Sequence, residues 1–224
     1  EEERVADLAL DPAAFPNAAG LQDDANLGRL TVTTAQGDMD GDGDFDRLFV
    51  PGGRSFSIWN ARTGALVFDS GAELEQLLAN LLPDEFNANH EENGSFDNRS
   101  DNKGPEPEGL ALGMVKGRLY AFVGLERIGG ILTLDLTDPR NPEYVDYVNN
   151  RQFRDAAGEP VPTCAAFDPP GSDDLDDCIA PNPVAGDLGP EGLEFVPAHQ
   201  APRGRPLLIV GNEVSGTTTV YEVR

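Results

Sequence analysis

Residues 37–50 carry aspartates at alternate positions, in the sequence GDMDGDGDFDRLFV. Carboxylates at this spacing can all turn toward one point if the chain curls around it, and Gly43 permits a sharp bend. Hard oxygen ligands in a flexible loop suit Ca²⁺, and without a cation such close carboxylates repel one another. The pattern D-x-D-x-D-G-x-x-D therefore predicts a Ca²⁺ loop in which Asp38, Asp40, Asp42 and Asp46 supply carboxylates and a backbone carbonyl near Asp44 adds another oxygen.

The flanks of this loop favour strands over helices. An EF-hand, in which helices flank the loop, needs a bidentate Glu at the twelfth loop position, where this chain has Phe49. Residues 30–36 and 46–53 are β-branched, aromatic and bounded by glycine, which predicts a β-hairpin around the loop. A solvated acidic turn is the alternative. A site closed by four carboxylates leaves little room for a substrate, which favours a structural ion over a catalytic one.

A second set of carboxylates recurs in a repeat that covers residues 105–134 and 190–221. Both copies read P-E-G-L, a strand, a turn, an apolar strand ending in V-G-x-E, and another strand. Glu108 matches Glu191, and Glu126 matches Glu213. If the strand ends point the same way, these glutamates converge on one mouth of a channel and bind Ca²⁺. Alternatively, they accept backbone hydrogen bonds within turns.

Basic residues lie in the same segments and can pair with an anion such as phosphate: Arg54, Lys103 and Arg127. A metal beside an arginine is the arrangement with which a phosphoester hydrolase activates water and holds the phosphoryl group. The corresponding catalytic hypothesis names Glu108, Glu126, Arg127, Glu191 and Glu213. His90 and His199 lie far apart in loop-like contexts and are not favoured as ligands or bases.

The elements that must position these residues are mostly strands. Only residues 72–82, AELEQLLANLL, show helical spacing, and Pro83 ends them. Short β-rich runs between Gly, Pro, Asn and Asp turns predict an all-β protein. Each repeat copy resembles a blade of antiparallel strands, and residues 46–70 form a looser third copy. Because three blades do not close a ring, we expect residues 1–224 to form one β-propeller-like domain or its C-terminal portion; a compact β-sandwich is the alternative.

Composition limits the partners. The formal net charge of −24 argues against nucleic acid and anionic membranes, and favours cations or a saline medium. No apolar run is long enough for a transmembrane helix. The chain opens EEERVADLAL, without the pattern of a signal peptide, which predicts a processed start or a fragment of something longer.

Residues 151–187 are predicted to be a loop-rich insertion within the domain, rich in Pro, Gly and Asp. They contain the only two cysteines, Cys164 and Cys178, which favour a disulfide over free thiols and hence an oxidising compartment. Asn93 and Asn98 begin N-x-S sequons, which mark surface loops if the source glycosylates.

Several long motifs resemble the choice-of-anchor I family: GDMDGDGDFDRLFVPGGRSFSIW, FDNRSDNKGPEPEGLALG, YAFVGLERIGGILTLDLTDPRNP, GDLGPEGLEFVP and PLLIVGNEVSGTTTVYEV. The resemblance runs from about Val5 to Arg224 and matches the C-terminal part of the family's domain. It implies a secreted or surface-tethered protein, in an extracellular, cell-surface or periplasmic location. The family is similar to surface glycoproteins linked to biomineral deposition, and some members carry an alkaline phosphatase label. A shorter likeness to phytase-like propellers implies an acidic channel filled with Ca²⁺.

Two functional hypotheses follow. The first is a secreted or cell-surface Ca²⁺-binding module with a structural or binding role toward surface or matrix components. The second is a Ca²⁺-dependent phosphoester hydrolase acting on phosphorylated small molecules. The two hypotheses differ in whether Glu108, Glu126, Glu191 and Glu213 share one pocket, as the hydrolase requires, or lie scattered across turns.

Overall fold

The computed structural model describes residues 2–50, 52–167 and 178–224. The chain forms two compact units, each considered by itself: residues 1–53 with 99–104, and residues 54–98 with 105–224. Every strand pair among the described elements is antiparallel, so the predicted all-β class is confirmed.

The first unit is built around a small antiparallel pair. Strand β1 pairs with β2, and two short helical segments follow β1; the bounds are β1 Glu2–Arg4, η1 Val5–Asp7, α1 Ala18–Leu21 and β2 Thr31–Thr33. Val5 and Val32 are fully buried. The carboxylate of Asp101 joins residues 99–104 to this unit, because Arg4 and Arg29 contact it at 3.2 and 2.7 Å.

The predicted hairpin around the acidic loop does not form, so that part of the prediction is wrong. Strand β2 pairs with β1, and residues 46–50 contain no strand. The N–H groups of Asp46 and Arg47 both donate to the carbonyl of Gly37, at 2.9 and 3.1 Å, so they cannot extend a ladder with β2. One bond, from Thr33 N to Phe49 O at 2.9 Å, connects the two flanks.

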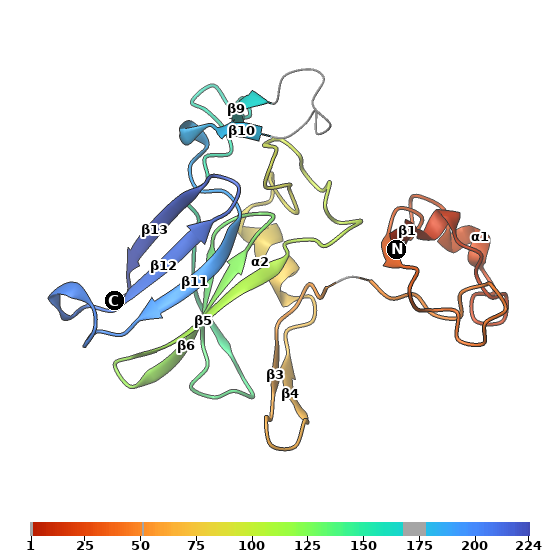
Figure 1. The fold of residues 1–224 in the computed structure, drawn as a ribbon, viewed down its shortest axis with the longest axis horizontal. Helices are drawn as coiled ribbons and strands as arrows, with labels where there is room; N and C mark the ends of the chain where they lie inside the picture. Colours follow the sequence, from red (N-terminus) through yellow and green to blue (C-terminus); the bar gives the residue numbers. More distant parts are fainter. Residues whose placement is uncertain (1, 51, 168–177) are drawn as a thin grey trace. The chain divides into compact units, whose positions relative to one another are not determined.

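The second unit contains both copies of the repeat, as two meanders (Figure 1). The four-strand sheet has the order β5-β6-β7-β8: β5 Pro107–Val115, β6 Arg118–Leu125, β7 Ile131–Asp135 and β8 Glu143–Val148. The three-strand sheet has the order β11-β12-β13: β11 Pro190–Val196, β12 Leu207–Asn212 and β13 Thr217–Glu222. Strands β5 and β11 both begin at P-E-G-L, so the repeat seen in the sequence is a repeat of structure.

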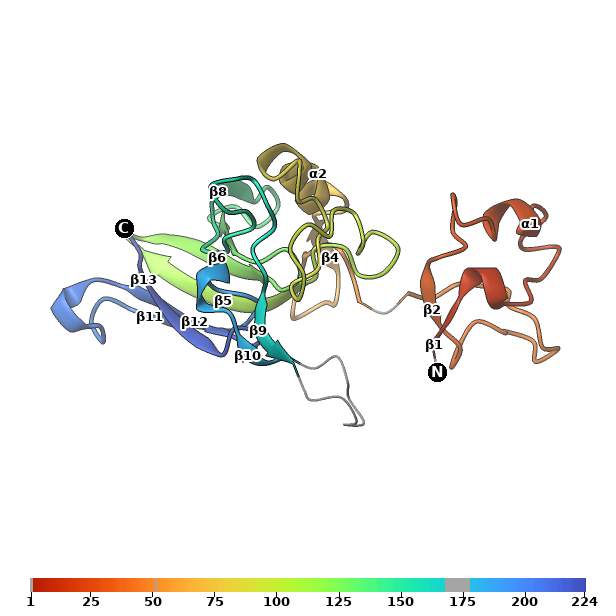
Figure 2. The ribbon, with the colours of Figure 1, turned by 90° about the horizontal axis from the view of Figure 1, so that it is seen from above.

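The two sheets lie face to face as separate layers (Figure 2). Phe195 of β11 stacks on Phe122 of β6, with ring centroids 5.7 Å apart. Glycines on the four-strand sheet allow this approach: a Cβ on Gly109 would lie 2.5 Å from Cδ1 of Leu193, and one on Gly113 would lie 2.6 Å from the Phe195 ring. Side chains at these two positions would hold the layers apart.

Helix α2, Glu73–Leu81, covers the other face of the four-strand sheet and confirms the helix predicted near 72–82. Its buried Leu74 and Leu78 join a core cluster with Val123, Leu125 and Leu132. The looser third copy contributes a two-stranded hairpin, β3 Ser57–Trp59 and β4 Leu66–Asp69.

The region between β8 and β11 holds a second small pair, β9 Cys164–Phe167 and β10 Cys178–Pro181, followed by η2 Pro183–Ala185. A further short helical segment, η3 Pro202–Gly204, lies between β11 and β12. The predicted disulfide between Cys164 and Cys178 is present. Residues 168–177 of the predicted insertion lie outside the described residues. Among the described helices, none has the length and apolar character needed to cross a bilayer.

A four-stranded antiparallel meander is the usual unit of a propeller blade, and here one such meander packs against a three-stranded meander. A closed ring of blades, and a single domain over the whole chain, stay predictions.

Leu78 supplies a test of the core beneath the four-strand sheet. Leu78→Ala leaves a cavity beneath the sheet and should lower the free energy of unfolding by about 2–4 kcal/mol. Leu81→Ala on the same helix is the control, since Leu81 is exposed, and should cost less than about 1 kcal/mol. Denaturant unfolding followed by circular dichroism measures both, and equal losses would contradict the assigned core.

Candidate cation-binding sites

The acidic loop of the first unit is closed at its base and organised by its own carboxylates. Asp38 accepts the N–H groups of Gly41 and Gly43 at 2.6 and 3.0 Å, and Asp46 accepts that of Met39 at 2.7 Å. Gly41 and Gly43 have φ of 82° and 100°, a region that favours glycine. The curl expected from the sequence is therefore present.

This curl gathers the aspartates into two groups. Asp38, Asp40 and Asp42, all exposed, each place one carboxylate oxygen within 4.8 Å of the others. Asp44 and Asp46 form a second group of the same kind with Asp11, which the sequence analysis did not include. The Asp11 N–H donates to the carbonyl of Phe45 at 3.1 Å, which explains how a distant residue reaches the loop.

The charges in the loop are not balanced by bases. No ion pair in the described part of the chain includes any of its five aspartates. The pKa of Asp40 is raised: the N–H of Asp42 lowers it, but the charge of Asp42, desolvation and the charges of Asp46 and Asp38 outweigh that bond. Desolvation and the charges of Asp42 and Asp11 raise the pKa of Asp44. The like-charge repulsion that contributes to both shifts is the part that a bound cation would relieve.

The second candidate site lies where β6 ends and β5 begins. Glu126 follows β6, Glu108 lies in β5, and Glu106 precedes β5 with a φ of 52°. The N–H of Glu126 donates to the carbonyl of Glu106 at 2.9 Å, which fixes the two segments side by side. One carboxylate oxygen from each of the three glutamates lies within 4.8 Å of the others.

Arg127 and His90 complete this glutamate cluster. The Nε of Arg127 donates to Glu106, and its Nη1 lies 2.8 Å from Nδ1 of His90. A guanidinium only donates, so Nδ1 of His90 is the acceptor in this contact. Its Nε2 then faces the carboxylate of Glu126, 3.7 Å away. Glu126 and His90 are 7% and 5% exposed and are therefore largely shielded from water, whereas Glu108 is exposed.

Glu126 retains a proton at neutral pH. Burial, a hydrogen bond shared with Glu108 and the charge of Glu106 raise its pKa to about 8, although Arg127 acts in the opposite direction. The cluster is thus partly neutralised by a proton and by Arg127. A divalent cation would have to displace that proton.

Arg151 fixes the segment that presents His90. It is buried, and it donates to the side chain of Asn93 at 2.8 Å and to the carbonyls of Asn89 and Arg127 at 2.6 and 3.1 Å. Its guanidinium also lies 4.5 Å from the centre of the Phe153 ring. Asn93 is itself buried, so the side chain of this sequon is not at the surface in this fold.

The repeat positions of the second copy carry no such cluster among the described residues. Glu191 and Glu213 are both exposed and belong to neither of the acidic groups in the loop nor to the glutamate cluster. The backbone bond is kept, since Glu213 N donates to Gly189 O at 2.7 Å. However, Gly189 stands where the first copy has Glu106, and Val214 stands where it has Arg127. The side chains that build the cluster are therefore missing there.

The structure brings together three of the five residues in the catalytic hypothesis: Glu108, Glu126 and Arg127. It adds Glu106 and His90, which the sequence analysis did not select. The sequence P-E-P-E-G-L could have identified Glu106, because residues two positions apart in an extended segment point to the same side, and Glu106 lies two residues before Glu108. Nothing in the sequence places His90 there.

Comparison with known proteins shows the family to which this chain belongs. The model of the choice-of-anchor I domain matches residues 1–139. The chain therefore belongs to the choice-of-anchor I domain family, as the sequence motifs indicated.

Two relatives are similar to this chain. Gigasin-3a of Magallana gigas is 31% identical over 210 residues, covering 91% of this chain and 67% of the relative. The mesenchyme-specific cell surface glycoprotein of Strongylocentrotus purpuratus is 31% identical over 104 residues, covering 39% of this chain and 13% of the glycoprotein. No solved structure matches the chain.

The raised pKa of Glu126 predicts a pH-dependent stability. Because the folded state holds this proton more tightly than the unfolded state, its stabilisation is present at low pH and is lost as pH rises through about 8. The free energy of unfolding of the wild type should fall by on the order of 1–2 kcal/mol between about pH 6 and pH 9, after allowance for solvent screening. The Glu126→Gln variant should not show this fall.

Chemical denaturation across this pH range measures the effect. Glu213→Gln is the matched control, because it changes the equivalent exposed residue of the second repeat. An unchanged pH slope in the Glu126→Gln variant would contradict the assignment.

Proposed function

We propose that this protein is an extracellular or cell-surface Ca²⁺-binding module with a structural or binding role, in a propeller-like fold. The family, and the cell-surface glycoprotein among the relatives, point to such a location. The disulfide between Cys164 and Cys178 fits an oxidising compartment.

The observation that carries the proposal is the acidic loop. Three exposed carboxylates lie within 4.8 Å of one another without a basic partner among the described residues. The charges of Asp42, Asp46 and Asp38 contribute to the raised pKa of Asp40, so the folded chain keeps these carboxylates together at an electrostatic cost. Hard oxygen donors on a flexible backbone are the ligand set that Ca²⁺ takes in proteins. Asp38, Asp40 and Asp42 would hold the ion, and the ion would offset their repulsion.

The glutamate cluster is the weaker calcium site on physical grounds. Arg127 and a proton on Glu126 already balance part of its charge, so folding does not require a metal there. A cation that did bind would compete with that proton, because ligands bind metals in their deprotonated form.

Calcium titration by calorimetry tests the proposal. We expect the wild-type chain to bind Ca²⁺, and the double variant Asp40→Asn, Asp42→Asn to lose the loop site. Asp24→Asn is the matched control, an exposed aspartate of the same unit that belongs to no acidic group, and it should bind as the wild type does. Absence of binding at millimolar calcium, or equal binding by the double variant, would refute the loop site.

The pH dependence of the same titration separates the two candidate sites. Affinity at the glutamate cluster should rise by about tenfold per pH unit below about pH 8, because one proton leaves Glu126. The double variant Glu106→Gln, Glu108→Gln should abolish this component, whereas Glu191→Gln with Glu213→Gln should leave it intact. A component that shows no pH dependence would not belong to the cluster.

Phosphoester hydrolysis is the second candidate function, favoured by the contact of Arg127 and His90 with the three glutamates. In this reading Arg127 would pair with the phosphate, a water molecule would attack phosphorus as the P–O bond to the leaving group breaks, and protonated Glu126 would give its proton to the leaving alkoxide, with the proton of the attacking water passing to solvent. It ranks second because Arg127 is already engaged by Glu106 and His90. Release of inorganic phosphate from an alkyl phosphate that is lost in Glu126→Gln and kept in Glu213→Gln would support it. Turnover in neither the wild type nor the control would remove it.

A further inference from the structure

Two segments of the second unit, residues 161–163 and 182–185, form a stem at the base of the β9–β10 pair. Asn182 closes this stem from one side. Its backbone N–H donates to the carbonyl of Thr163 at 2.8 Å, and its side-chain Nδ2 donates to the carbonyl of Pro162 at 2.7 Å. The two segments are therefore held side by side where the β9–β10 pair begins and ends.

The apolar core of the stem is small. Its buried members among the described residues are Val161, Ala185 and Leu188. Three buried residues supply little apolar burial against the chain entropy that docking of the segment costs. The disulfide between Cys164 and Cys178, which lie 14 residues apart, limits the conformations of the undocked segment and so favours the docked one.

The same stem holds the loop of residues 89–95. The hydroxyl of Thr163 donates to the carbonyl of Glu91, and Nδ2 of Asn93 donates to the carbonyl of Val161 at 2.7 Å. Both bonds join positions about 70 residues apart in the chain, with separations of 72 and 68. The loop consequently keeps these bonds only while the stem is docked.

The loop depends on such bonds because it has no apolar anchor of its own. Its sequence, NHEENGS, contains no large apolar side chain. Its buried side chains are those of Asn89, His90, Asn93 and Ser95. Polar groups away from water stay in place only while their hydrogen bonds are satisfied, since each lost bond leaves a buried group without a partner. Loss of the stem contacts should therefore loosen the loop.

We propose that the disulfide is a redox-sensitive switch that controls the order of residues 89–95 and, through them, the contact of His90 with Arg127 in the glutamate cluster. In the oxidised chain the stem is docked, and Nδ1 of His90 lies 2.8 Å from Nη1 of Arg127. In the reduced chain the loop loosens and this contact is lost. The inference rests on neither of the proposed functions.

The redox step is thiol–disulfide exchange with a dithiol. The S–S bond between Cys164 and Cys178 breaks, and the two sulfurs take up two electrons and two protons to become thiols. The dithiol gives up the same two electrons and two protons and forms its own disulfide. Because the cross-link no longer limits the undocked segment, the population with an open stem should rise on the order of a hundredfold.

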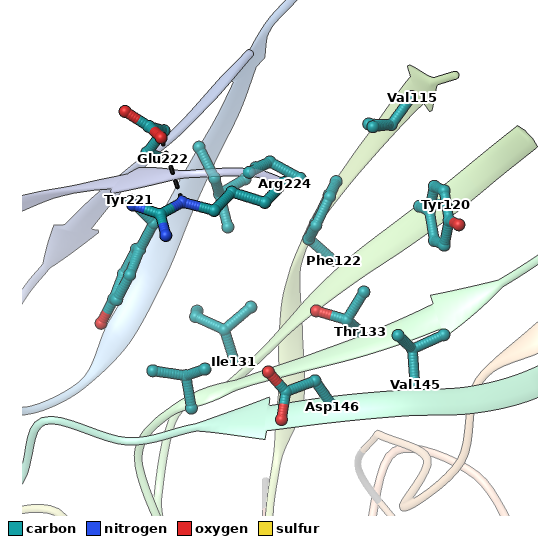
Figure 3. A pocket seen from close by; sticks show the side chains of 13 residues that line it. Val115, Tyr120, Phe122, Ile131, Thr133, Val145, Asp146, Tyr221, Glu222 and Arg224 are labelled. Carbon is teal, nitrogen blue, oxygen red and sulfur yellow. Dashed lines mark hydrogen bonds and ion pairs between the residues drawn. The ribbon is translucent and has the colours of Figure 1, made fainter. Parts of the chain in front are cut away.

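Amide hydrogen exchange of the full chain in EDTA measures the order of the loop. The N–H of Asn89 donates to the buried hydroxyl of Ser95 at 2.9 Å and should exchange slowly in the oxidised chain. We expect dithiothreitol to speed exchange across residues 89–95 at least about tenfold. Strand β7 is the internal reference, because Ile131 belongs to a separate core cluster and lines the cavity shown in Figure 3. Exchange in β7 should change less than about twofold.

The two histidines of the chain provide a second readout. His90 belongs to the loop, whereas His199 is exposed in the turn after β11 and serves as the internal control. In NMR spectra of histidine-labelled protein, the ring signals of His90 should move on reduction while those of His199 stay in place. The variant His199→Gln assigns the two sets of signals.

Variants separate the disulfide from the stem. Cys164→Ser combined with Cys178→Ser should reproduce the reduced chain and no longer respond to dithiothreitol. Thr163→Val keeps the disulfide but removes the hydroxyl bond to the loop, and should speed exchange at residues 89–95 about fivefold. Thr218→Val is the matched control, because Thr218 is an exposed threonine of β13, and exchange of the loop should stay as in the wild type.

Three outcomes would overturn the proposal. Unchanged exchange of the loop and unchanged His90 signals after complete reduction would show that the disulfide does not control the loop. Equal acceleration in β7 would show that the disulfide stabilises the whole unit instead. Equal loop exchange in Thr163→Val and Thr218→Val would show that the stem does not hold the loop.

Discussion

Close approach of two β-sheets sets the geometry of the second unit. Leu193 and Phe195 can rest on the four-strand sheet only because Gly109, Gly113 and Gly124 present backbone there. The stacked rings of Phe122 and Phe195 then fill the space between the layers. Gly124 lies two residues before Glu126, and Gly109 directly follows Glu108. The packing that joins the sheets thus also fixes the strand ends that carry the glutamate cluster.

The chain manages its acidic residues in two opposite ways. In the loop, solvent-facing aspartates are held together by backbone N–H groups, and their repulsion remains as raised pKa values. In the glutamate cluster, burial is tolerated because Arg127 supplies one positive charge and Glu126 keeps a proton. The first arrangement leaves negative charge that no basic side chain of the described residues neutralises, which favours a cation. The second is close to balanced and is sensitive to pH.

Arg151 is a further buried charge whose hydrogen-bond donors are satisfied. Burial lowers its pKa to about 10, yet its donors are satisfied by Asn93 and by carbonyls of residues 89, 92 and 127. A satisfied buried network specifies one backbone arrangement, since breaking any bond leaves a polar group without water. The loop that carries His90 is therefore held firmly beside Arg127.

The sequence by itself determined what is local or repeated. Alternating aspartates with Gly43, the helical spacing that ends before Pro83, and the two P-E-G-L meanders all depend on short-range chemistry, and each is present in the structure. Tertiary structure alone decided which carboxylates meet. His90 and Asp11 join their clusters through contacts with residues far along the chain, and Glu191 stays outside because Gly189 and Val214 replace the charged partners of the first copy. Such pairings depend on how distant segments pack, and no periodicity within one segment encodes them.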